Sequence, residues 1–400
     1  MTITIHRGQK QIGGSIIEIA TADTRIVFDV GINLDEGNTV TVPQIEGMFA
    51  GGIAFDAVFV SHYHADHMGL LAHILPGIPI YMGEKAFKIV EAANDYRGVS
   101  APFEPEFLYS DKTVIVGDIS VTPILCDHSA FDAYMFVVEA DGKKVLYTGD
   151  FRANGRLDFD SFFDKLPEVD AVIIEGTTLS RDENKPNIEE EFLEDIAEGA
   201  LQKYTGPAFI MMSAMNIDRI VTAYNAAQHT NRLFLEDIYT AGVATAAGED
   251  IPQPNSNYNV RVFTTGGDKQ YRMLQRYGTA KIGKAAIVKQ PFLMCVRPSM
   301  KRYLAKLNEL CPFENGILFY GMWKGYMDEP DVKDFLDFMA EKGVKLHILH
   351  TSGHADSMSI ERVIAKTKPR VIVPVHTEND EWFGRFDGVT VVYECNHFEI

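Results

Sequence analysis

The chain has 400 residues, of which 46% are hydrophobic and 23% charged, and its formal net charge is −19. This composition excludes a disordered or fibrous protein, and the length predicts two globular domains, each with its own core. No apolar run reaches the roughly 18 residues of a membrane span, and the amino terminus shows no signal-peptide pattern, so we expect a soluble cytoplasmic protein.

The four cysteines are scattered along the chain and show no CxxC spacing. This pattern argues against a disulfide framework and against a zinc cluster held by thiolates. We therefore expect Cys126, Cys295, Cys311 and Cys395 to be reduced packing residues.

The predicted secondary structure changes character along the chain. The first 150 residues hold short stretches that alternate apolar and polar residues, as strands with one buried face do. The acidic stretch 180–192 predicts a linker and a helix start. Beyond it, apolar strands alternate with helical segments, which predicts a parallel sheet covered by helices. The expected strands are 15–22, 24–31, 56–62, 78–82, 119–125, 134–140, 143–150, 207–212, 232–237, 259–265, 285–290, 316–321, 345–351, 370–376 and 390–395.

The second half has the pattern of a dinucleotide-binding fold but lacks its fingerprint. After the strand expected at 207–212 the sequence reads SAMNIDRI, without GxGxxG. Pyrophosphate would have no glycine-lined approach to a helix. A nicotinamide cofactor is therefore not expected.

One segment departs from the acidic average. Residues 259–306 contain eleven Lys and Arg but a single acid, Asp268. Such a segment suits a polyanion that approaches from one side, although a charge run is also a common solvated face. Both interpretations stay open.

The sequence SHYHADHMG, residues 61–69, follows the apolar run AVFV and predicts a metal site. His62 and His64 can reach one cation, and Asp66 and His67 can reach a second. Imidazole and carboxylate ligands without thiolate favour Zn²⁺, with Mn²⁺ as the alternative.

HYHADH resembles the motif of the metallo-β-lactamase superfamily, and this resemblance implies further ligands at the ends of later strands. His128 follows 119–125, Asp150 follows 143–147, and His376 follows 370–375. By this likeness the first metal is held by His62, His64 and His128, the second by Asp66, His67 and His376, and Asp150 bridges both.

Later motifs resemble the β-CASP nucleases of this superfamily, with the ribonuclease J group as the closest likeness. Glu175 in EGTT, His354 in HTSGHAD and His376 in VPVH match the acid and the two histidines of that group. A histidine at the last position is typical of the RNA-acting branch. The chain departs from the group in Thr377, where glycine is usual, and ends at Ile400, so we expect a compact relative without the further carboxyl-terminal domain.

The resemblance assigns roles to these side chains. His354 is the expected general acid, Glu175 the residue that holds it, and Asp66 and Asp150 complete the catalytic set. Asp29 and Asp127 are candidates to hold the second ring nitrogens of His128 and His376, with helix capping or turn formation as the alternative for both. Ser352 and Gly353 would form a phosphate-binding nest at a helix start.

The resemblance also implies an α/β architecture: an αββα metallo-β-lactamase sandwich with an inserted Rossmann-like β-CASP domain. The core would comprise residues 1–180 and 345–400, and the insert residues 181–344. Ligands of such sheets gather at the carboxyl ends of strands. The insert would therefore contact substrate through Asn216, Arg219 and Lys324, with a base stacked on Trp323 or Tyr326 unless these aromatics pack between domains.

The sequence thus predicts a two-metal hydrolase that cleaves single-stranded RNA, and is compatible with a homo-oligomer. The alternative is a hydrolase of a small ester, thioester or lactone on the same core. A metal-containing but inactive binding module is a third class, against which the complete ligand set argues.

Overall fold

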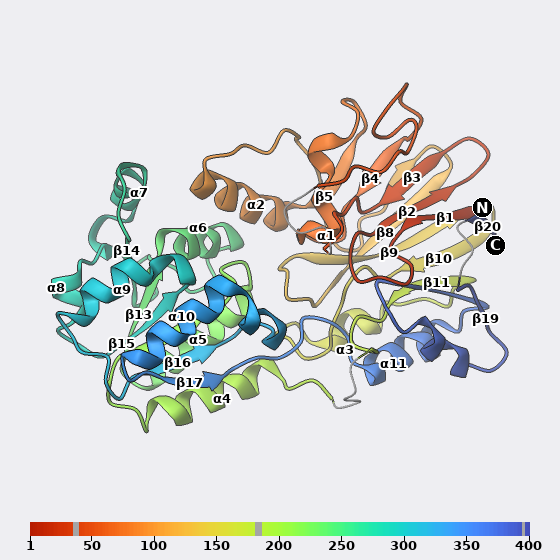
Figure 1. Cartoon of the computed structure of the whole chain (residues 1–400). Coiled ribbons are helices and arrows are strands. Elements are labelled where there is room, and N and C mark those ends of the chain that lie inside the picture. Colours follow the sequence, from red (N-terminus) through yellow and green to blue (C-terminus); the bar gives the residue numbers. More distant parts are fainter. Residues whose placement is uncertain (35–39, 181–185, 394–396) are drawn as a thin grey trace. The chain divides into compact units, whose positions relative to one another are not determined.

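The computed structural model describes residues 1–34, 40–180, 186–393 and 397–400 (Figure 1). The chain divides into two compact units. Unit 1 comprises Met1–Phe87, Ala101–Asn187 and Gly353–Ile400, and unit 2 comprises Lys88–Ser100 and Ile188–Ser352. Residues 181–185, where the boundary at Arg181 is expected, lie outside the described residues, as does Cys395. No helix in the described ranges is long and apolar enough to cross a membrane.

Two mixed sheets, each with seven strands within the described residues, form the centre of unit 1. The first ends with β20 beside β1, so the two chain termini lie next to each other (Figure 1). In spatial order the first sheet is β20 (His397–Glu399), β1 (Thr2–Arg7), β2 (Ile16–Ala20), β3 (Arg25–Phe28), β4 (Ala57–Phe59), β5 (Ile80–Gly83) and β6 (Glu106–Leu108). The second is β19 (Thr390–Val391), β18 (Val371–Val375), β11 (Ala171–Glu175), β10 (Lys143–Tyr147), β9 (Ala133–Ala140), β8 (Ile119–Cys126) and β7 (Val114–Val116).

The core of unit 1 lies between these sheets. Alternate residues of each strand point inward, so Ile3 and Ile5 of β1 join the same buried cluster as Val138 of β9. Phe28 and Phe136 meet across the two sheets with ring centroids 5.1 Å apart. Fully burying one such side chain contributes roughly 1.5–3 kcal/mol, and this cluster therefore fixes the loops at the sheet edge.

Helices cover the outer face of the second sheet. They are α3 (Phe159–Phe163) and α11 (Ser357–Thr367), together with the 3-10 helix η5 (Asp380–Arg385). Ile360, Val363 and Ile364 of α11 have the spacing of one helix face and pack on that sheet. The loop before β5 carries α1 (Ala65–Met68) and the 3-10 helix η1 (Leu71–His73). Unit 1 is therefore the expected metallo-β-lactamase α/β sandwich.

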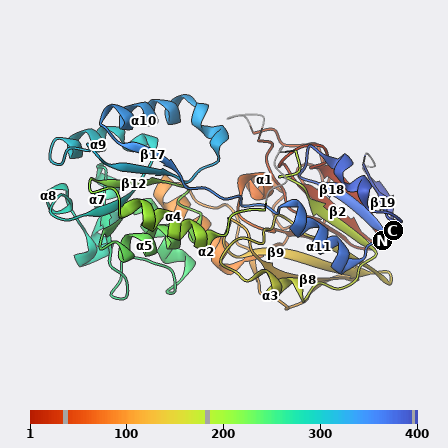
Figure 2. The same ribbon diagram turned by 90° about the horizontal axis from the view of Figure 1, so that it is seen from below.

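Unit 2 is built on a six-stranded parallel sheet within the described residues. Its helices lie on both faces, with α9 and α10 on one side and α4 and α5 on the other (Figure 2). The strands in spatial order are β14 (Val260–Phe263), β13 (Leu233–Asp237), β15 (Phe292–Val296), β12 (Ala208–Met211), β16 (Ile317–Tyr320) and β17 (Lys345–Ile348). The helices are α4 (Glu190–Leu201), α5 (Ile217–His229), α6 (Ile238–Ala247), α7 (Asp268–Leu274), α8 (Lys284–Ile287), α9 (Lys301–Asn308) and α10 (Pro330–Glu341), with 3-10 helices η2 (Gln275–Ala280), η3 (Pro298–Met300) and η4 (Lys324–Asp328).

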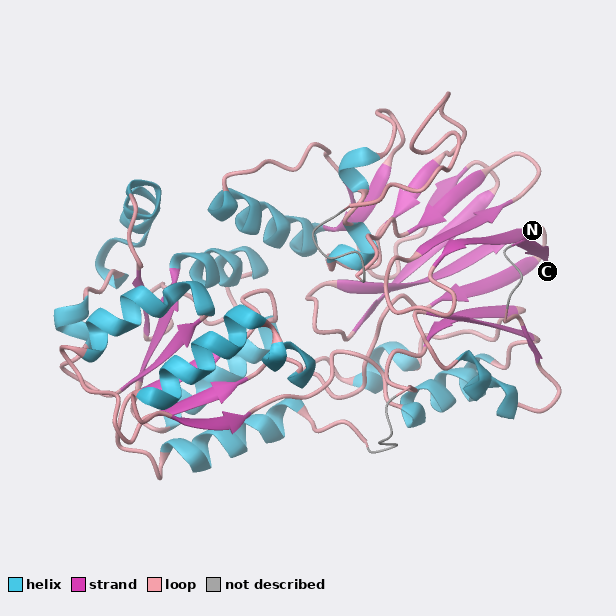
Figure 3. Cartoon of the chain, viewed as in Figure 1, coloured by secondary structure: helices cyan, strands magenta, loops and turns pink. Residues whose placement is uncertain are grey.

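The strand expected at 285–290 is wrong. These residues lie in and after α8, and the strand follows at Phe292–Val296 (Figure 3). Ala285 and Ala286 are strong helix formers, whereas the run FLMCV has the apolar character of a buried strand. The later part of helix α2 (Glu84–Arg97) belongs to unit 2, which was not expected from the sequence.

Candidate metal centre

Five loops of unit 1 meet at one edge of its sheets. In the second sheet β10, β11 and β18 are parallel neighbours, and β8 runs in the same direction because both β8 and β10 are antiparallel to β9. The residues at and just after the ends of these strands therefore meet at one edge. They include His128, Asp150, Glu175 and His376, while β4 of the first sheet leads into the loop with His62.

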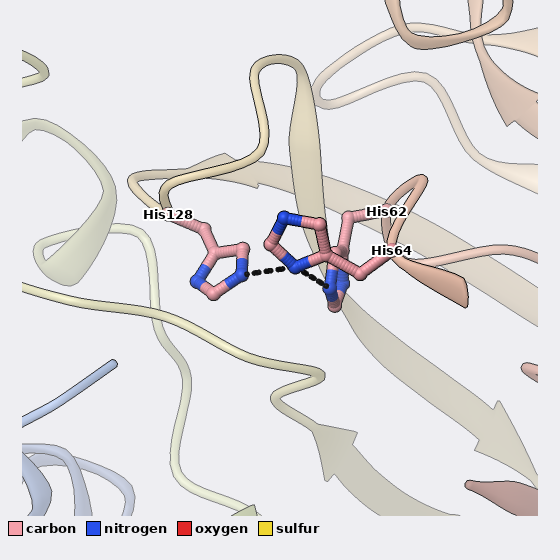
Figure 4. A group of neighbouring side chains, drawn as sticks. All are labelled: His62, His64 and His128. Carbon is pink, nitrogen blue, oxygen red and sulfur yellow. Dashed lines mark hydrogen bonds between the residues drawn. The ribbon is translucent and has the colours of Figure 1, made fainter. Parts of the chain in front are cut away.

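Three histidines form the first candidate cation site (Figure 4). His62 Nε2 and His128 Nε2 each lie 3.1 Å from His64 Nδ1. Two nitrogens that are each about 2.0–2.1 Å from one tetrahedral ion lie roughly 3.4 Å apart. The three imidazoles thus have nearly the separation that a single zinc ion requires.

Asp66, His67 and His376 form the second candidate site. His376 Nε2 lies 3.0 Å from Asp66 Oδ2, and His67 Nε2 lies 3.8 Å from the same oxygen. The side chains of His67 and His376 are 1% exposed and that of Asp66 is 13% exposed. One carboxylate and two imidazoles suit a divalent cation of borderline hardness.

Asp150 lies between the two sets. Its Oδ2 is 3.2 Å from His67 Nε2, 3.7 Å from both His62 Nε2 and His376 Nε2, and 4.0 Å from His128 Nε2. The carboxylate is buried, yet within the described residues neither of its oxygens has a hydrogen-bond partner, and His67 Nε2 has none either. A buried charge without partners is costly unless it is paired or binds a metal, so the donor set fits bound cations.

The pKa values of three histidines and of Asp66 suit metal ligands, whereas burial lowers the pKa of His67 but nearby carboxylates outweigh it and leave that pKa well above the usual histidine value. Burial lowers the pKa of His64 to about 4, against the opposing effect of nearby carboxylates. Burial likewise lowers the pKa of His62 and of His128 well below the usual histidine value. Although burial raises the pKa of Asp66, its histidine neighbours outweigh this and leave it lowered. Neutral imidazoles and ionised carboxylates are the forms that bind metal.

Asp29 supports the histidines of the HYHADH loop rather than His128 and His376. Its Oδ2 accepts hydrogen bonds from Ser61 Oγ at 2.8 Å and from Tyr147 Oη at 2.6 Å, and lies 2.8 Å from His67 Nδ1. Ser61 Oγ in turn lies 3.0 Å from His62 Nδ1. These contacts engage Nδ1 of both histidines and direct Nε2 of each toward the site.

Asp127 does not hold a histidine ring. Its Oδ1 pairs with Arg152 Nε, and its Oδ2 accepts from the backbone of Leu157 at 2.8 Å. Both members of the ion pair are buried. The turn-forming alternative therefore describes Asp127, with the added function of stabilising the loop after β10.

Glu175 and His354 lie beside the cation cluster. Glu175 Oε2 is 3.1 Å from His354 Nδ1, and Asp150 Oδ2 is 3.5 Å from the same nitrogen. Burial lowers the pKa of His354, but these two carboxylates outweigh it and raise the pKa overall. The His354 side chain is 21% exposed, which leaves an ionisable imidazole at the open side of the cluster.

Three hydroxyl groups near the site were not identified from the sequence. Ser61 and Tyr147 contact Asp29, and Thr177 contacts Glu175 and His376. The position of Ser61 directly before the histidine motif was a usable signal. Thr177 stands in EGTT and Tyr147 stands three residues before Asp150, but this signal is weak because threonine and tyrosine are common at strand ends.

The expected phosphate nest is not seen at a helix start. The N-terminus of α11 is capped by Asp356, whose carboxylate accepts from the backbone of Ser359 at 2.9 Å. Ser352 and Gly353 precede that cap, and Ser352 is buried. A carboxylate already occupies the position that an anion would take.

Of the expected substrate contacts in unit 2, Lys324 is exposed and Asn216 caps α5 by accepting from the backbone of Arg219 at 3.1 Å. The assignment of Arg219 is corrected. Its guanidinium is wholly buried, pairs with Glu190 at 2.6 Å and donates to the carbonyl of Leu349 at 2.6 Å. Arg219 stabilises the interior of unit 2 and does not reach a polyanion.

Two families match the chain. Residues 24–235, more than half of it, match the β-lactamase superfamily domain. Residues 328–382, which include His354 and His376, match the Zn-dependent metallo-hydrolase RNA specificity domain.

Curated relatives share low identity with the chain. An RNase J-like protein of Methanocaldococcus jannaschii is 27% identical over 56% of this chain and 54% of its own length. Ribonuclease J of Sinorhizobium meliloti is 21% identical over 87% of this chain and 64% of its own. Transcription termination factor FttA of Methanococcus maripaludis is 24% identical over 93% of this chain and 66% of its own. The chain thus spans about half to two thirds of the length of these relatives.

A solved structure shares the whole fold. The crystal structure of a protein of unknown function from Enterococcus faecalis matches with a TM-score of 0.80 at 21% identity, over 99% of both chains. This likeness concerns the fold alone. The two family matches, with the relatives above, show that the chain belongs to the metallo-β-lactamase superfamily, in the β-CASP, ribonuclease J-like group.

Proposed function

We propose that the chain is an RNA phosphodiesterase that uses two divalent cations, with Zn²⁺ favoured over Mn²⁺. The observation that carries this proposal is the buried carboxylate of Asp150, which lies within 4.0 Å of five imidazoles and has no hydrogen-bond partner in the described part of the chain. Imidazole and carboxylate groups that gather in this way, around a carboxylate without a hydrogen bond, form a donor set that suits divalent cations.

The seven ligands divide between two sites. A first cation would be held by His62, His64 and His128 and a second by Asp66, His67 and His376, and Asp150 lies close enough to both sets to contribute to each. Two cations bound there would lower the pKa of a shared water and stabilise the charge on a phosphodiester under in-line attack.

His354 is proposed as the general acid. When the bond between phosphorus and the leaving oxygen breaks, that oxygen needs a proton, and an imidazolium close to neutral pKa is a suitable donor. Glu175 contacts Nδ1 of His354, so the transferred proton would come from Nε2. The carboxylate thereby fixes the ring orientation and favours the charged form.

RNA is proposed as the substrate on two grounds. Residues 328–382 match an RNA specificity domain, and several relatives are named as ribonucleases. The basic segment 259–306 also keeps much of its charge at the surface of unit 2. Within the described residues Arg276, Arg297 and Lys301 pair with acids, whereas the exposed Arg272, Lys289, Arg302 and Lys306 have no acidic partner.

The test compares metal-loaded protein on 5′-monophosphorylated single-stranded RNA, on bis-p-nitrophenyl phosphate and on a lactone. We expect cleavage of the RNA, with a loss of about 10²–10⁴-fold in His354→Ala. Turnover of the lactone without cleavage of either phosphodiester would instead favour the small-molecule hydrolase. RNA binding without hydrolysis, unchanged in His354→Ala, would favour the inactive binding module.

A further inference from the structure

We propose that Thr177 is a positioning residue that sets the tautomer of His376 and so prepares it to bind the second cation. The inference rests on the proposed function, since it concerns a ligand of the proposed metal centre. It adds a residue to which the resemblance assigns no role, although this residue stands in EGTT with Glu175, and it places that residue at one of the two sites.

The Thr177 hydroxyl lies between a carboxylate and an imidazole. Thr177 Oγ1 is 2.7 Å from Glu175 Oε2 and 2.8 Å from His376 Nδ1. All three side chains are at most 3% exposed, so water does not compete for these contacts. The register of β11 and β18 places Glu175 opposite Val375, next to His376, which brings the three groups together.

The hydroxyl has a single proton to donate, and this decides the direction of both hydrogen bonds. A carboxylate oxygen can only accept, so the 2.7 Å contact requires Thr177 to donate to Glu175. Thr177 Oγ1 must then accept from His376 Nδ1–H at 2.8 Å. The reverse direction would leave two acceptor oxygens facing each other in a buried site.

When the neutral His376 ring carries its proton on Nδ1, its Nε2 carries none. In the neutral Nδ1–H tautomer the lone pair lies on Nε2, and this atom is 3.0 Å from Asp66 Oδ2. Two acceptors at this separation repel unless a positive charge lies near both. The tautomer that Thr177 selects is therefore the one that binds a cation.

Without the hydroxyl the ring has a competing arrangement. His376 could move its proton to Nε2 and donate it to Asp66 at 3.0 Å, and that tautomer has no Nε2 lone pair for a metal. The backbone supports the side chain: His376 has φ of 51°, and its N–H donates to the carbonyl of Gly8 at 2.7 Å. Such a left-handed residue persists only where its surroundings hold it.

The experiment compares Thr177→Val, which keeps the shape but lacks the hydroxyl, with Thr177→Ser, which keeps it. Thr178→Val is the matched control, because the Thr178 hydroxyl donates to the carbonyl of Ala355 at 2.6 Å and contacts no ligand. Zinc affinity and zinc per chain are measured by competition with a chelator. The histidine tautomers are read from ¹⁵N chemical shifts of the metal-free protein labelled at histidine.

We expect Thr177→Val to bind the second zinc about 10- to 100-fold more weakly, to keep the first, and to lose the His376 Nδ1–H signal. Thr177→Ser and Thr178→Val should resemble the parent. Two zinc ions held with parent affinity by Thr177→Val would overturn the role of Thr177 and leave the proposed function standing. A parent chain that binds no zinc would instead remove the metal centre itself. If Thr177→Val does not fold, Thr177→Ala against Thr177→Ser gives the same comparison.

Discussion

Asp150 is the residue at which the two candidate cation sites meet. In Asp150→Asn the shape is kept but the shared negative charge is lost, so we expect fewer cations per chain and a loss of hydrolysis of at least about 100-fold. The metal-free variant should be less stable than the metal-free parent, because burial raises the pKa of Asp150 but the surrounding histidines outweigh it and hold that pKa well below its usual value, so the folded parent favours the charged carboxylate. Metal analysis, RNA cleavage and urea unfolding measure these effects, and full activity in the variant would contradict a bridging role.

We predict that the stability of unit 2 depends on pH because of the buried Glu236. It is fully buried, neither carboxylate oxygen has a hydrogen-bond partner within the described ranges, and burial raises its pKa well above 4.5. Above about pH 4.5 the folded state therefore binds a proton that the unfolded state releases, and stability falls as pH rises, by at most about 1.4 kcal/mol per pH unit. Glu236→Gln removes this linkage.

We therefore expect Glu236→Gln to gain stability over the parent progressively from pH 5 to pH 8 in urea unfolding. Exposed Glu249→Gln is the control and should show no such trend. A constant difference between Glu236→Gln and the parent across this range would show that the Glu236 carboxyl ionises normally.

Candidate metal ligands that belong to a sequence motif were easier to predict than the residues that hold these ligands in place. HYHADH names four candidate ligands because their spacing is local, and the strand ends that carry Asp150 and His376 could be recognised by family resemblance. The structure brings all seven side chains together, while their role as ligands stays a prediction. Thr177 and Tyr147 could not be found, because their contacts depend on the pairing of distant strands.

At the scale of elements, the exposed basic side of α9 is where we predict that unit 2 contacts the proposed RNA substrate. Arg302 and Lys306 lie one turn apart on its exposed side, and such like charges destabilise a helix unless an anion offsets them. In the double variant Arg302→Glu, Lys306→Glu we expect weaker RNA binding and a salt slope reduced by roughly 1 for each phosphate that the variant no longer binds. Fluorescence anisotropy with chelator-treated protein avoids cleavage during the measurement.

The matched control for α9 is Lys333→Glu with Lys345→Glu. These two lysines are also exposed on unit 2 but lie outside the basic segment. The control changes the net charge by the same amount, so it separates a local interaction from a general charge effect. An equal loss of affinity in both double variants would mean that α9 is only a solvated face.

Helices and strands with a clear hydrophobic pattern in the sequence were predicted well, and those without such a pattern were not. The apolar strands expected in both units coincide with observed strands except at 285–290, where two alanines lie within the helix α8. The contribution of Lys88–Ser100 to unit 2 could not be predicted either, since it rests on contacts such as Tyr96 stacked on Tyr239, with ring centroids 5.0 Å apart. Nothing in the sequence indicates that these two rings pack together.

At the scale of the whole molecule, the separate cores of the two units predict a selective effect of metal removal. All seven candidate ligands belong to unit 1, and the apolar clusters of unit 2 consist only of residues of unit 2. A ligand that binds only the folded state stabilises it by about 4 kcal/mol at 1,000 times its dissociation constant. Chelation should therefore lower the unfolding temperature of unit 1 and leave that of unit 2 unchanged in calorimetry. Asp150→Asn should show a smaller shift on chelation, and equal shifts of both transitions in the parent would contradict a centre confined to unit 1.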